Sequence, residues 1–280
     1  MIVTIVGIGL IGGSMALDLK NRGFAKKVIG VDRNLNHQNV AILSKIVDEI
    51  DELEPAVKKA DLIILATPID VIQKLLPVVL NYTLGTQKVI TDAGSTKAGI
   101  CQLVKDHPNR AQYVASHPMA GTEYSGPMAA VSRLFDYKNV IICDKEESSK
   151  QALRIVKKMY DTLNMKLIFM NSKQHDVSAA YVSHMSHISS FVLSLAVLEK
   201  EKNEKRILNL ASGGFASTVR LAKSSAEMWV PVFEQNSTYI LEVIDTYMEK
   251  LQNFRNAIAA NDDDKLKELI NQANHIQKIL

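Results

Sequence analysis

The stretch that decides the fold is Ile2-Val-Thr-Ile-Val6, which runs directly into Gly7-Ile-Gly9-Leu-Ile-Gly12. A short β-branched run, a G-x-G-x-x-G loop and a helical segment, in that order, are typical of the first unit of a dinucleotide-binding sheet. We expect Gly7 to allow the tight turn, Gly9 to let a pyrophosphate approach the backbone, and Gly12 to let strand and helix pack closely. The loop therefore predicts a phosphate site at the start of the first helix.

The residues around this loop indicate which dinucleotide binds. Leu10 and Ile11 open the helix, whose free N–H groups and positive dipole end would face the phosphates. The second strand runs into Asp32, and a carboxylate there can accept both adenosine ribose hydroxyls and repel a 2′-phosphate. The sequence therefore predicts NAD as the cofactor. Arg33 leaves NADP open, because a guanidinium beside the ribose can hold a 2′-phosphate.

Short apolar runs alternate with helical segments up to about residue 171. The predicted strands are Ile2–Val6, Lys27–Val31, Leu62–Ala66, Lys88–Thr91, Tyr113–Ala115, Val140–Cys143 and Leu167–Phe169. Such alternation implies crossover connections and a doubly wound, mostly parallel sheet with both faces covered. Ligands bind at the carboxyl ends of these strands, where Thr67 and Pro68 are candidates to line the nicotinamide. Both are also ordinary turn residues.

After residue 171 the pattern becomes helical. We predict one long helix over Gln174–Glu199, a second over Val232–Ala260, and a last one over Asp263–Leu280 that Asn261-Asp262 would cap. The sequence thus divides into a Rossmann-type domain, residues 1–171, and an all-helical domain, residues 172–280. The two long helices carry more apolar surface than a small bundle can bury, so we expect a homodimer with a two-fold axis.

The composition is that of an ordinary folded globule, with 47% hydrophobic and 22% charged residues. A formal net charge of +3 argues against a nucleic-acid binder. The uncharged N-terminal segment lacks a basic flank and is interrupted by glycines, so it does not resemble a signal peptide, and no unbroken apolar stretch suits a membrane helix. Cys101 and Cys143 fit a reducing compartment. We predict a cytoplasmic protein without a metal site.

A histidine follows the predicted strand Tyr113–Ala115. At that carboxyl end, beside a nicotinamide, His117 is placed to take the proton of a substrate hydroxyl while hydride leaves the same carbon. Asp92-Ala-Gly-Ser95-Thr-Lys97 follows another strand and is expected in the same crevice. A loop histidine taken alone is more often structural than catalytic. The motif around His117 favours the catalytic role.

The segment His117-Pro-Met-Ala-Gly-Thr-Glu123-Tyr-Ser-Gly126 closely resembles the H-P-[IM]-A-G-T-E-x-S-G signature of the prephenate dehydrogenase family. The resemblance covers essentially the whole chain, in the family's order. Its other parts are Asp92–Lys97, His175-Asp176, Ser183–His187, Gly213-Gly214-Phe215, Arg220 and Glu227-Met228-Trp229. It implies a homodimeric enzyme that uses NAD to oxidise and decarboxylate prephenate to 4-hydroxyphenylpyruvate in tyrosine biosynthesis.

The resemblance also implies roles for residues at the reacting centre. His117 would take the proton of the ring hydroxyl, and Ser95 would orient His117 and touch the nicotinamide. Arg220 would bind a substrate carboxylate, for which a planar guanidinium is well suited. No general acid is required for the loss of CO₂.

Four further residues are assigned to the substrate pocket by the same resemblance. Glu123 would belong to a gating polar network, and His187 would lie near the substrate side chain. Gly213 would contribute to substrate binding, and Trp229 would reach into the pocket of the partner subunit. The active site would then be shared across the dimer interface.

Two departures from the family pattern leave alternatives open. Many members carry Arg-Asp where this chain has Ala216-Ser217, which leaves open arogenate in place of prephenate. Ser186 stands where a proline is usual, so we expect a straighter helix there. Another β-hydroxyacid-type dehydrogenase and a non-catalytic NAD-responsive dimer are the remaining alternatives. The family's added ACT or chorismate mutase domain is not expected in this chain.

Overall fold

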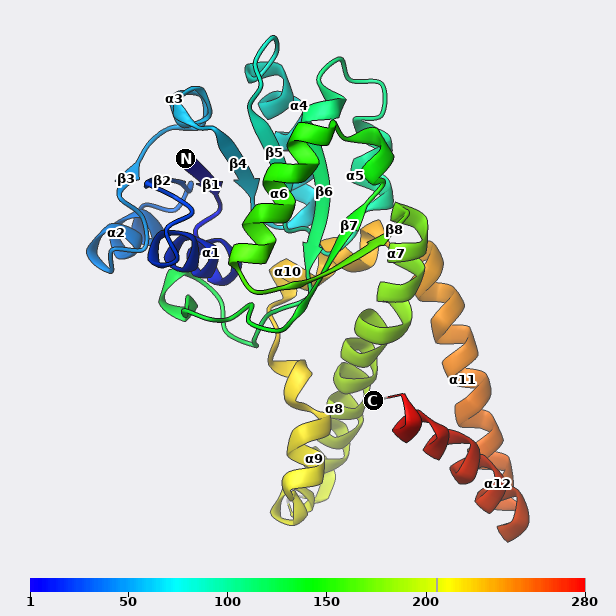
Figure 1. Ribbon diagram of the computed structural model, residues 1–280. Coiled ribbons are helices and arrows are strands. Elements are labelled where there is room, and N and C mark those ends of the chain that lie inside the picture. The colour runs from blue at the N-terminus through cyan, green and yellow to red at the C-terminus, as the bar shows by residue number, and fades with distance from the viewer. Residues whose placement is uncertain (205, 280) are drawn as a thin grey trace. The chain divides into compact units, whose positions relative to one another are not determined.

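The structure is a computed structural model that describes residues 1–204 and 206–279, and the chain forms two compact units, Met1–Asn236 and Ser237–Leu280. The first unit is built on an eight-stranded sheet of order β3-β2-β1-β4-β5-β6-β7-β8 (Figure 1). The strands are β1 (Ile2–Val6), β2 (Lys27–Val31), β3 (Glu49–Ile50), β4 (Leu62–Leu65), β5 (Val89–Asp92), β6 (Tyr113–Pro118), β7 (Asn139–Cys143) and β8 (Lys166–Met170).

The sheet is parallel from β3 to β6, and its order reverses between β1 and β4. Strand β7 is antiparallel to β6, and β8 is parallel to β7. The predicted doubly wound, mostly parallel sheet is therefore confirmed. The carboxyl ends of β1, β4, β5 and β6 lie at one edge of the sheet. Sheets of this kind bind ligands at that edge, beside the point where the strand order reverses.

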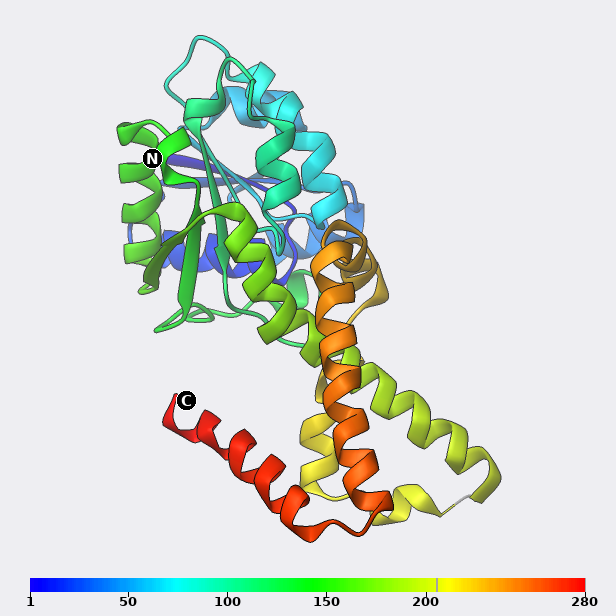
Figure 2. The same cartoon turned by 90° about the vertical axis from the view of Figure 1, so that its right-hand side faces the viewer.

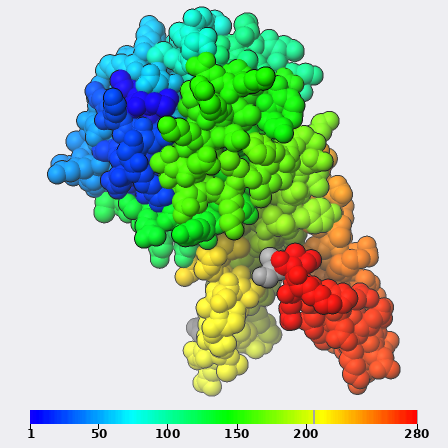
Figure 3. Space-filling view, viewed as in Figure 1, coloured from blue at the N-terminus to red at the C-terminus, as the bar shows by residue number. Residues whose placement is uncertain are grey.

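Helices cover both faces of this sheet (Figure 2). They are α1 (Leu10–Asn21), α2 (Leu35–Leu43), α3 (Leu53–Lys59), α4 (Ile69–Tyr82), α5 (Ala98–Leu103) and α6 (Lys150–Thr162). Side chains of α1 and α6 share one buried cluster, and those of α3, α4 and α5 share the other. All four residues of β4 are buried, as expected for a strand covered on both faces. In the space-filling view the green segment that contains α6 forms much of the front of the first unit (Figure 3).

Two strand predictions need correction. The predicted list omits β3, a two-residue strand whose Glu49–Ile50 gives no apolar run. Strand β6 continues past the predicted end at Ala115, because Ser116, His117 and Pro118 pair in register with β7. His117 therefore lies within the sheet, opposite Ile141, and not in the loop that follows.

The helical part of the first unit begins at α7 (Ser172–Ala179), which Asn171 and Gln174 start with a capping box. A π-helical turn, Ala180–His184, joins α7 to α8 (Met185–Glu204). The predicted long helix is thus present, but it extends from Ser172 to Glu204. It also contains a π-helical turn, which a segment without proline did not lead us to expect. Shorter helices follow: α9 (Gly213–Thr218) and α10 (Ala226–Gln235).

The predicted helix Val232–Ala260 is wrong, because the chain breaks at Asn236 between α10 and α11 (Ser237–Ala259). The Asn236 backbone is not helical (φ −113°, ψ 21°), and its side-chain amide donates to the carbonyl of Asp176. An asparagine that finds such a partner competes with the helix, which ends there.

The second unit consists of α11 and α12 (Asp263–Asn274), which a short turn joins, and no residue of α12 is buried. Asp262 caps α12 by accepting from the backbone N–H of Lys265 at 2.9 Å, which confirms the predicted cap. The α-helix ends at Asn274 and a 3₁₀ turn, His275–Lys278, follows. Leu280, the predicted helix end, lies outside the described residues.

One continuous helical stretch, Ser172–Glu204, is long and apolar enough to cross a membrane by length and composition alone. Only 17% of its most apolar window is buried within the chain. This is weak evidence for a membrane segment, because an exposed apolar helix face is equally what a protein–protein interface requires.

Candidate active site

The glycine loop joins β1 to α1 and is shaped by close backbone contacts. Gly7 has φ +94°, and a Cβ there would lie 2.7 Å from the carbonyl oxygen of Ala66. A Cβ on Gly12 would lie 2.1 Å from the Gly7 carbonyl oxygen, so only glycine fits at these two positions of the loop. Around Gly9, by contrast, a Cβ would meet nothing within 4 Å. The loop thus leaves open the one position where a phosphate group would approach.

The first turn of α1 has the properties of an anion site. Gly9 is its N-cap and supplies no side-chain hydrogen bond to the free N–H groups of the helix. Leu10 is buried and Ile11 half-buried, so their side chains anchor the turn while the backbone N–H groups remain for a ligand. These residues fit the pyrophosphate of a dinucleotide.

Asp32 lies beside the glycine loop, directly after β2. Its carboxylate accepts the backbone N–H of Ile8 at 3.0 Å and that of Asn34 at 2.9 Å. The ring Nδ1 of His37 lies 3.4 Å from the same carboxylate. These contacts fix the carboxylate next to the phosphate-binding turn, where an adenosine ribose would lie. Arg33 is exposed.

Thr67 and Pro68 follow β4 on the other side of the glycine loop. The Thr67 methyl carbon would lie 2.8 Å from a Cβ on Gly7, so the two loops are in contact. Pro68 is the N-cap of α4. The Thr67 hydroxyl is buried and has no hydrogen-bond partner within the described chain. A buried hydroxyl without a partner is costly, which fits a position that a bound nicotinamide would satisfy.

His117 extends from the carboxyl end of β6 into the same edge of the sheet. Its Nδ1 lies 2.9 Å from Nε2 of His175, whose own Nδ1 lies 2.7 Å from the carboxylate of Asp176. Burial is the main cause that lowers the pKa of His117 well below its usual range, and His175 and Lys97 add to it. The imidazole is therefore unprotonated near neutral pH, as a base must be.

Ser95 is half-buried in the turn after β5. Within residues 1–204 and 206–279, no hydrogen bond joins Ser95 to His117. The partner of His117 Nδ1 is His175, and the role that the resemblance gives to Ser95 stays a prediction. Sequence reasoning quoted His175-Asp176 as part of the motif but assigned it no role.

A buried ion pair supports the ends of β5 and β6. Lys97 and Asp92 are both 0% exposed, and the Lys97 ammonium contacts the Asp92 carboxylate and the Ser116 carbonyl oxygen. Asp92 also accepts from the Tyr113 hydroxyl at 2.7 Å and from the Ser116 backbone N–H at 3.1 Å. Sequence reasoning missed this cluster, although Asp92 and Lys97 lay in the quoted motif.

His184, His187 and Trp229 form an aromatic cluster next to the His117 centre. The ring centroids of His187 and Trp229 are 3.7 Å apart, and those of His184 and Trp229 are 5.8 Å apart. His184 Nδ1 lies 3.1 Å from the Asn236 amide nitrogen. Burial lowers the pKa of His184 to about 4 and also lowers the pKa of His187. Both rings are thus neutral near neutral pH.

Trp229, which the resemblance places in a partner's pocket, lies in the aromatic cluster of its own chain in this single-chain structure, and its role across an interface stays a prediction. Its side chain is 7% exposed within its own chain, where it packs against His187 and Phe233. Its ring N–H is buried without a hydrogen-bond partner in the described chain.

Arg220 and Glu123 come from distant segments and meet at the outer side of this cluster. Arg220 Nη1 lies 3.3 Å from Glu123 Oε2, and their side chains are 52% and 21% exposed. The positive charge of Arg220 contributes to the low pKa of His187, which places the guanidinium near that ring. Gly213, the first residue of α9, is exposed. Within the described residues, no group of three or more His, Cys, Asp or Glu side chains could hold a metal ion.

A mostly parallel sheet with a glycine-rich turn, a carboxylate beside that turn and an uncharged histidine at one edge is the arrangement of a Rossmann-type oxidoreductase. The model of the "Prephenate dehydrogenase, nucleotide-binding domain" matches residues 15–169, and that of the "Prephenate dehydrogenase, dimerization domain" matches residues 171–272. The chain belongs to the prephenate dehydrogenase family.

Individual relatives agree with this assignment. The chain is 30% identical to the prephenate dehydrogenase of Lactococcus lactis, over 99% of this chain and 77% of that protein. A crystal structure of prephenate dehydrogenase from Aquifex aeolicus, in complex with hydroxyphenyl propionate and NAD⁺, has a TM-score of 0.87 at 25% identity and covers 100% of this chain and 98% of that one. The arogenate dehydrogenase of Synechocystis has a TM-score of 0.80 at 27% identity and covers 99% of both chains.

Proposed function

We propose that this enzyme catalyses the NAD-dependent oxidative decarboxylation of prephenate to 4-hydroxyphenylpyruvate. The observation that carries the proposal is the uncharged His117 at the carboxyl end of β6, on the sheet edge that also bears the glycine loop. Family membership and the similarity to two enzymes named prephenate dehydrogenase support the choice of substrate. NAD, when bound, accepts the hydride from the ring carbon that carries the hydroxyl.

The protein's own residues then have three tasks. The Gly9 turn and Asp32 hold the cofactor, and Thr67 offers its free hydroxyl to it. His117 takes the hydroxyl proton through Nε2, because its Nδ1 is occupied by His175. As the ring carboxylate leaves as CO₂, the electron pair of the broken bond passes through the ring to the oxygen. That oxygen then recovers the proton from His117, so no further acid is needed.

Arg220 is the proposed anchor for a carboxylate of the substrate. The guanidinium is half-exposed and has only one side-chain partner in the described chain, the Glu123 carboxylate at 3.3 Å. A substrate carboxylate can replace or share that partner with two parallel hydrogen bonds. The neutral rings of His187 and Trp229 beside it provide an apolar wall for the rest of the side chain.

Replacing Arg220 with lysine should raise KM for prephenate about tenfold, because lysine keeps the charge but not the two-pronged geometry. NADH formation at 340 nm over a range of prephenate concentrations measures this. Lys223→Arg, one turn further along the same segment, is the control and should leave KM unchanged. An Arg220→Lys enzyme with the wild-type KM would rule out the anchor.

Replacing Asp32 with alanine should raise KM for NAD about tenfold and weaken discrimination against NADP, because charge-assisted hydrogen bonds to the ribose and the repulsion of a 2′-phosphate are both lost. Kinetics with each cofactor at saturating prephenate give the two ratios. A wild-type preference for NADP would show that Arg33 dominates and that NAD is not the natural cofactor.

Arogenate is the second candidate substrate. Ala216-Ser217 lies just before Arg220, where many family members have Arg-Asp, and the structural similarity includes an arogenate dehydrogenase. Because that charge pair is absent, both the keto side chain of prephenate and the amino side chain of arogenate are candidates. Parallel assays at 340 nm with prephenate and arogenate, each with NAD and NADP, separate the two activities.

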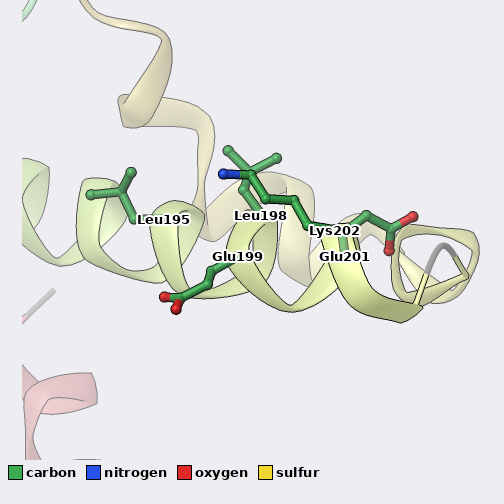
Figure 4. A pocket seen from close by; sticks show the side chains of 5 residues that line it. All are labelled: Leu195, Leu198, Glu199, Glu201 and Lys202. Carbon is green, nitrogen blue, oxygen red and sulfur yellow. The ribbon is translucent and has the colours of Figure 1, made fainter.

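We also propose that the enzyme is a cytoplasmic homodimer with a substrate and dimerisation domain over residues 172–280. The helix start at Asn171 and the adjoining family models support the division. The outer half of α8 exposes Leu195 and Leu198, which line a hollow with Glu199, Glu201 and Lys202 (Figure 4). In α11, Leu241, Met248 and Leu251 are at least 60% exposed. Such apolar faces are what a dimer would cover.

A site shared across that interface is part of the same proposal. The glycines of α9, where a Cβ on Gly213 or Gly214 would meet nothing within 4 Å, leave room for a second subunit, and the role of Trp229 in a partner's pocket belongs to the same proposal. Light scattering of the purified protein tests the dimer.

A further inference from the structure

A string of hydrogen bonds runs from Asp176 through His175 to His117. The Asp176 carboxylate lies 2.7 Å from His175 Nδ1, and His175 Nε2 lies 2.9 Å from His117 Nδ1. Asp176 and His175 are each 2% exposed, so water does not compete for these contacts. The two imidazoles meet edge to face, with ring centroids 5.1 Å apart and an interplanar angle of 65°. This is the geometry of a directed hydrogen bond between rings, because the nitrogen of one ring points at the nitrogen of the other.

Asp176 sets the direction of the string. Its Oδ1 accepts the backbone N–H of Lys97 at 2.7 Å, and its Oδ2 accepts that of Ala98 at 2.8 Å. An N–H group can only donate, so both oxygens act as acceptors. The His175 nitrogen that faces Asp176 therefore carries a proton. In a neutral imidazole only one nitrogen carries a proton, so His175 Nε2 is an acceptor.

The same reasoning extends one ring further. Because His175 Nε2 accepts, the hydrogen bond to His117 requires a proton on His117 Nδ1. The second nitrogen of His117, Nε2, then has a free lone pair. We propose that His175 and Asp176 are positioning residues that hold His117 in the tautomer whose Nε2 accepts the substrate hydroxyl proton. This inference rests on the proposed function and specifies how its base is prepared.

Asn236 holds this series of hydrogen bonds in place. The backbone carbonyl of Asp176 accepts from the Asn236 side-chain amide at 2.8 Å, and the same amide nitrogen lies 3.1 Å from His184 Nδ1. Asn236 thereby ties α7 to the π-helical turn that ends at His184. When His117 takes a proton, the Asp176 carboxylate is the nearest negative charge along the string and stabilises the imidazolium that forms. The aspartate thus supports both states of the base.

Two substitutions of His175 separate positioning from mere packing. In His175→Gln the side-chain amide reaches the place of Nε2 and can still accept from His117. In His175→Asn the amide stays near Asp176 and His117 loses its acceptor. We expect kcat to fall about threefold to tenfold in His175→Gln and about 100-fold in His175→Asn, since the wrong tautomer removes the base. KM for NAD should stay near the wild-type value in both.

His107→Asn is the matched control, because His107 bonds Asn81 at the protein surface, far along the chain from this centre. Its kcat should equal that of the wild type. Equal losses of kcat in the glutamine and asparagine variants, or an asparagine variant within about threefold of the wild type, would overturn the positioning role.

The tautomer itself can be read without any substrate. The chain has 7 histidines, few enough for ¹⁵N imidazole spectra to be assigned by single substitutions. We expect the wild type to show a proton on His117 Nδ1 and a bare Nε2, and His175→Asn to lose this preference. A wild-type His117 protonated on Nε2 contradicts the inference whatever the enzyme's substrate is. Absence of NADH formation from prephenate would count instead against the proposed function, and the spectra would still decide the tautomer.

Discussion

The His117→Asn enzyme is expected to turn over about two to four orders of magnitude more slowly than the wild type, with NAD binding nearly unchanged. The amide cannot take a proton, while His117 makes no hydrogen bond to the glycine loop or to Asp32, the proposed binding residues of the cofactor. The rate constant is measured from NADH absorbance at saturating substrate, and NAD binding by calorimetry.

The pH dependence of the wild type provides a second check on the base. Burial lowers the pKa of His117 well below 6.5, so the neutral ring, which is the active form, persists as the pH falls through 6.5. The acid limb of kcat/KM should therefore lie below pH 6.5 and should be absent in His117→Asn. A variant with near-normal turnover, or with the same acid limb, would show that another group is the base.

Lys97→Met is expected to destabilise the first unit by about 3–5 kcal/mol, because it leaves the Asp92 carboxylate buried without its counter-ion. Methionine is close to lysine in length, so lost packing contributes little. Asp92 would keep its bonds from Tyr113 and Ser116, but these neutral donors do not replace a charge. Urea denaturation followed by circular dichroism measures the change in the free energy of unfolding.

Lys59→Met is the matched control for this experiment. Lys59 also pairs with two carboxylates, those of Glu49 and Asp51, but its side chain is 47% exposed. Solvent screens such pairs, so Lys59→Met should lower the free energy of unfolding far less than Lys97→Met does. If both variants lost the same small amount of stability, the buried ion pair of Lys97 and Asp92 would stabilise the fold no more than an exposed pair does. The prediction for Lys97 would then be wrong.

The part of the fold that sequence could predict is the part encoded in local patterns. The β-branched runs gave seven of the strands because a buried parallel strand is apolar along its whole length. Glu49–Ile50 has no such run, since a two-residue edge strand needs only backbone partners. His117 was expected in a loop for a similar reason: its place in β6 comes from pairing with Ile141, which no local pattern reveals.

The residues of the candidate site also fall into those that a local motif predicts and those that only the folded chain brings together. Gly7, Gly9 and Gly12 stand in one short motif with a geometric meaning of its own, and Asp32 follows at a typical distance. The contact between His117 and His175 joins residues 58 apart in the chain, and only the packing of α7 against the sheet brings them together. The break at Asn236 likewise depends on Asp176 and His184, far away in sequence, so a periodic apolar pattern predicted one helix where there are two.

The antiparallel pairing of β6 with β7 separates the parts of the enzyme that can vary in evolution. Because His117 is held in register opposite Ile141, insertions or deletions in the connection between Pro118 and Asn139 can change that connection's length without displacing the histidine. Glu123 lies in this connection and would move with every such change. Changes in the length of this connection would therefore alter the surroundings of Glu123 and Arg220 while the proposed proton acceptor keeps its place on the strand.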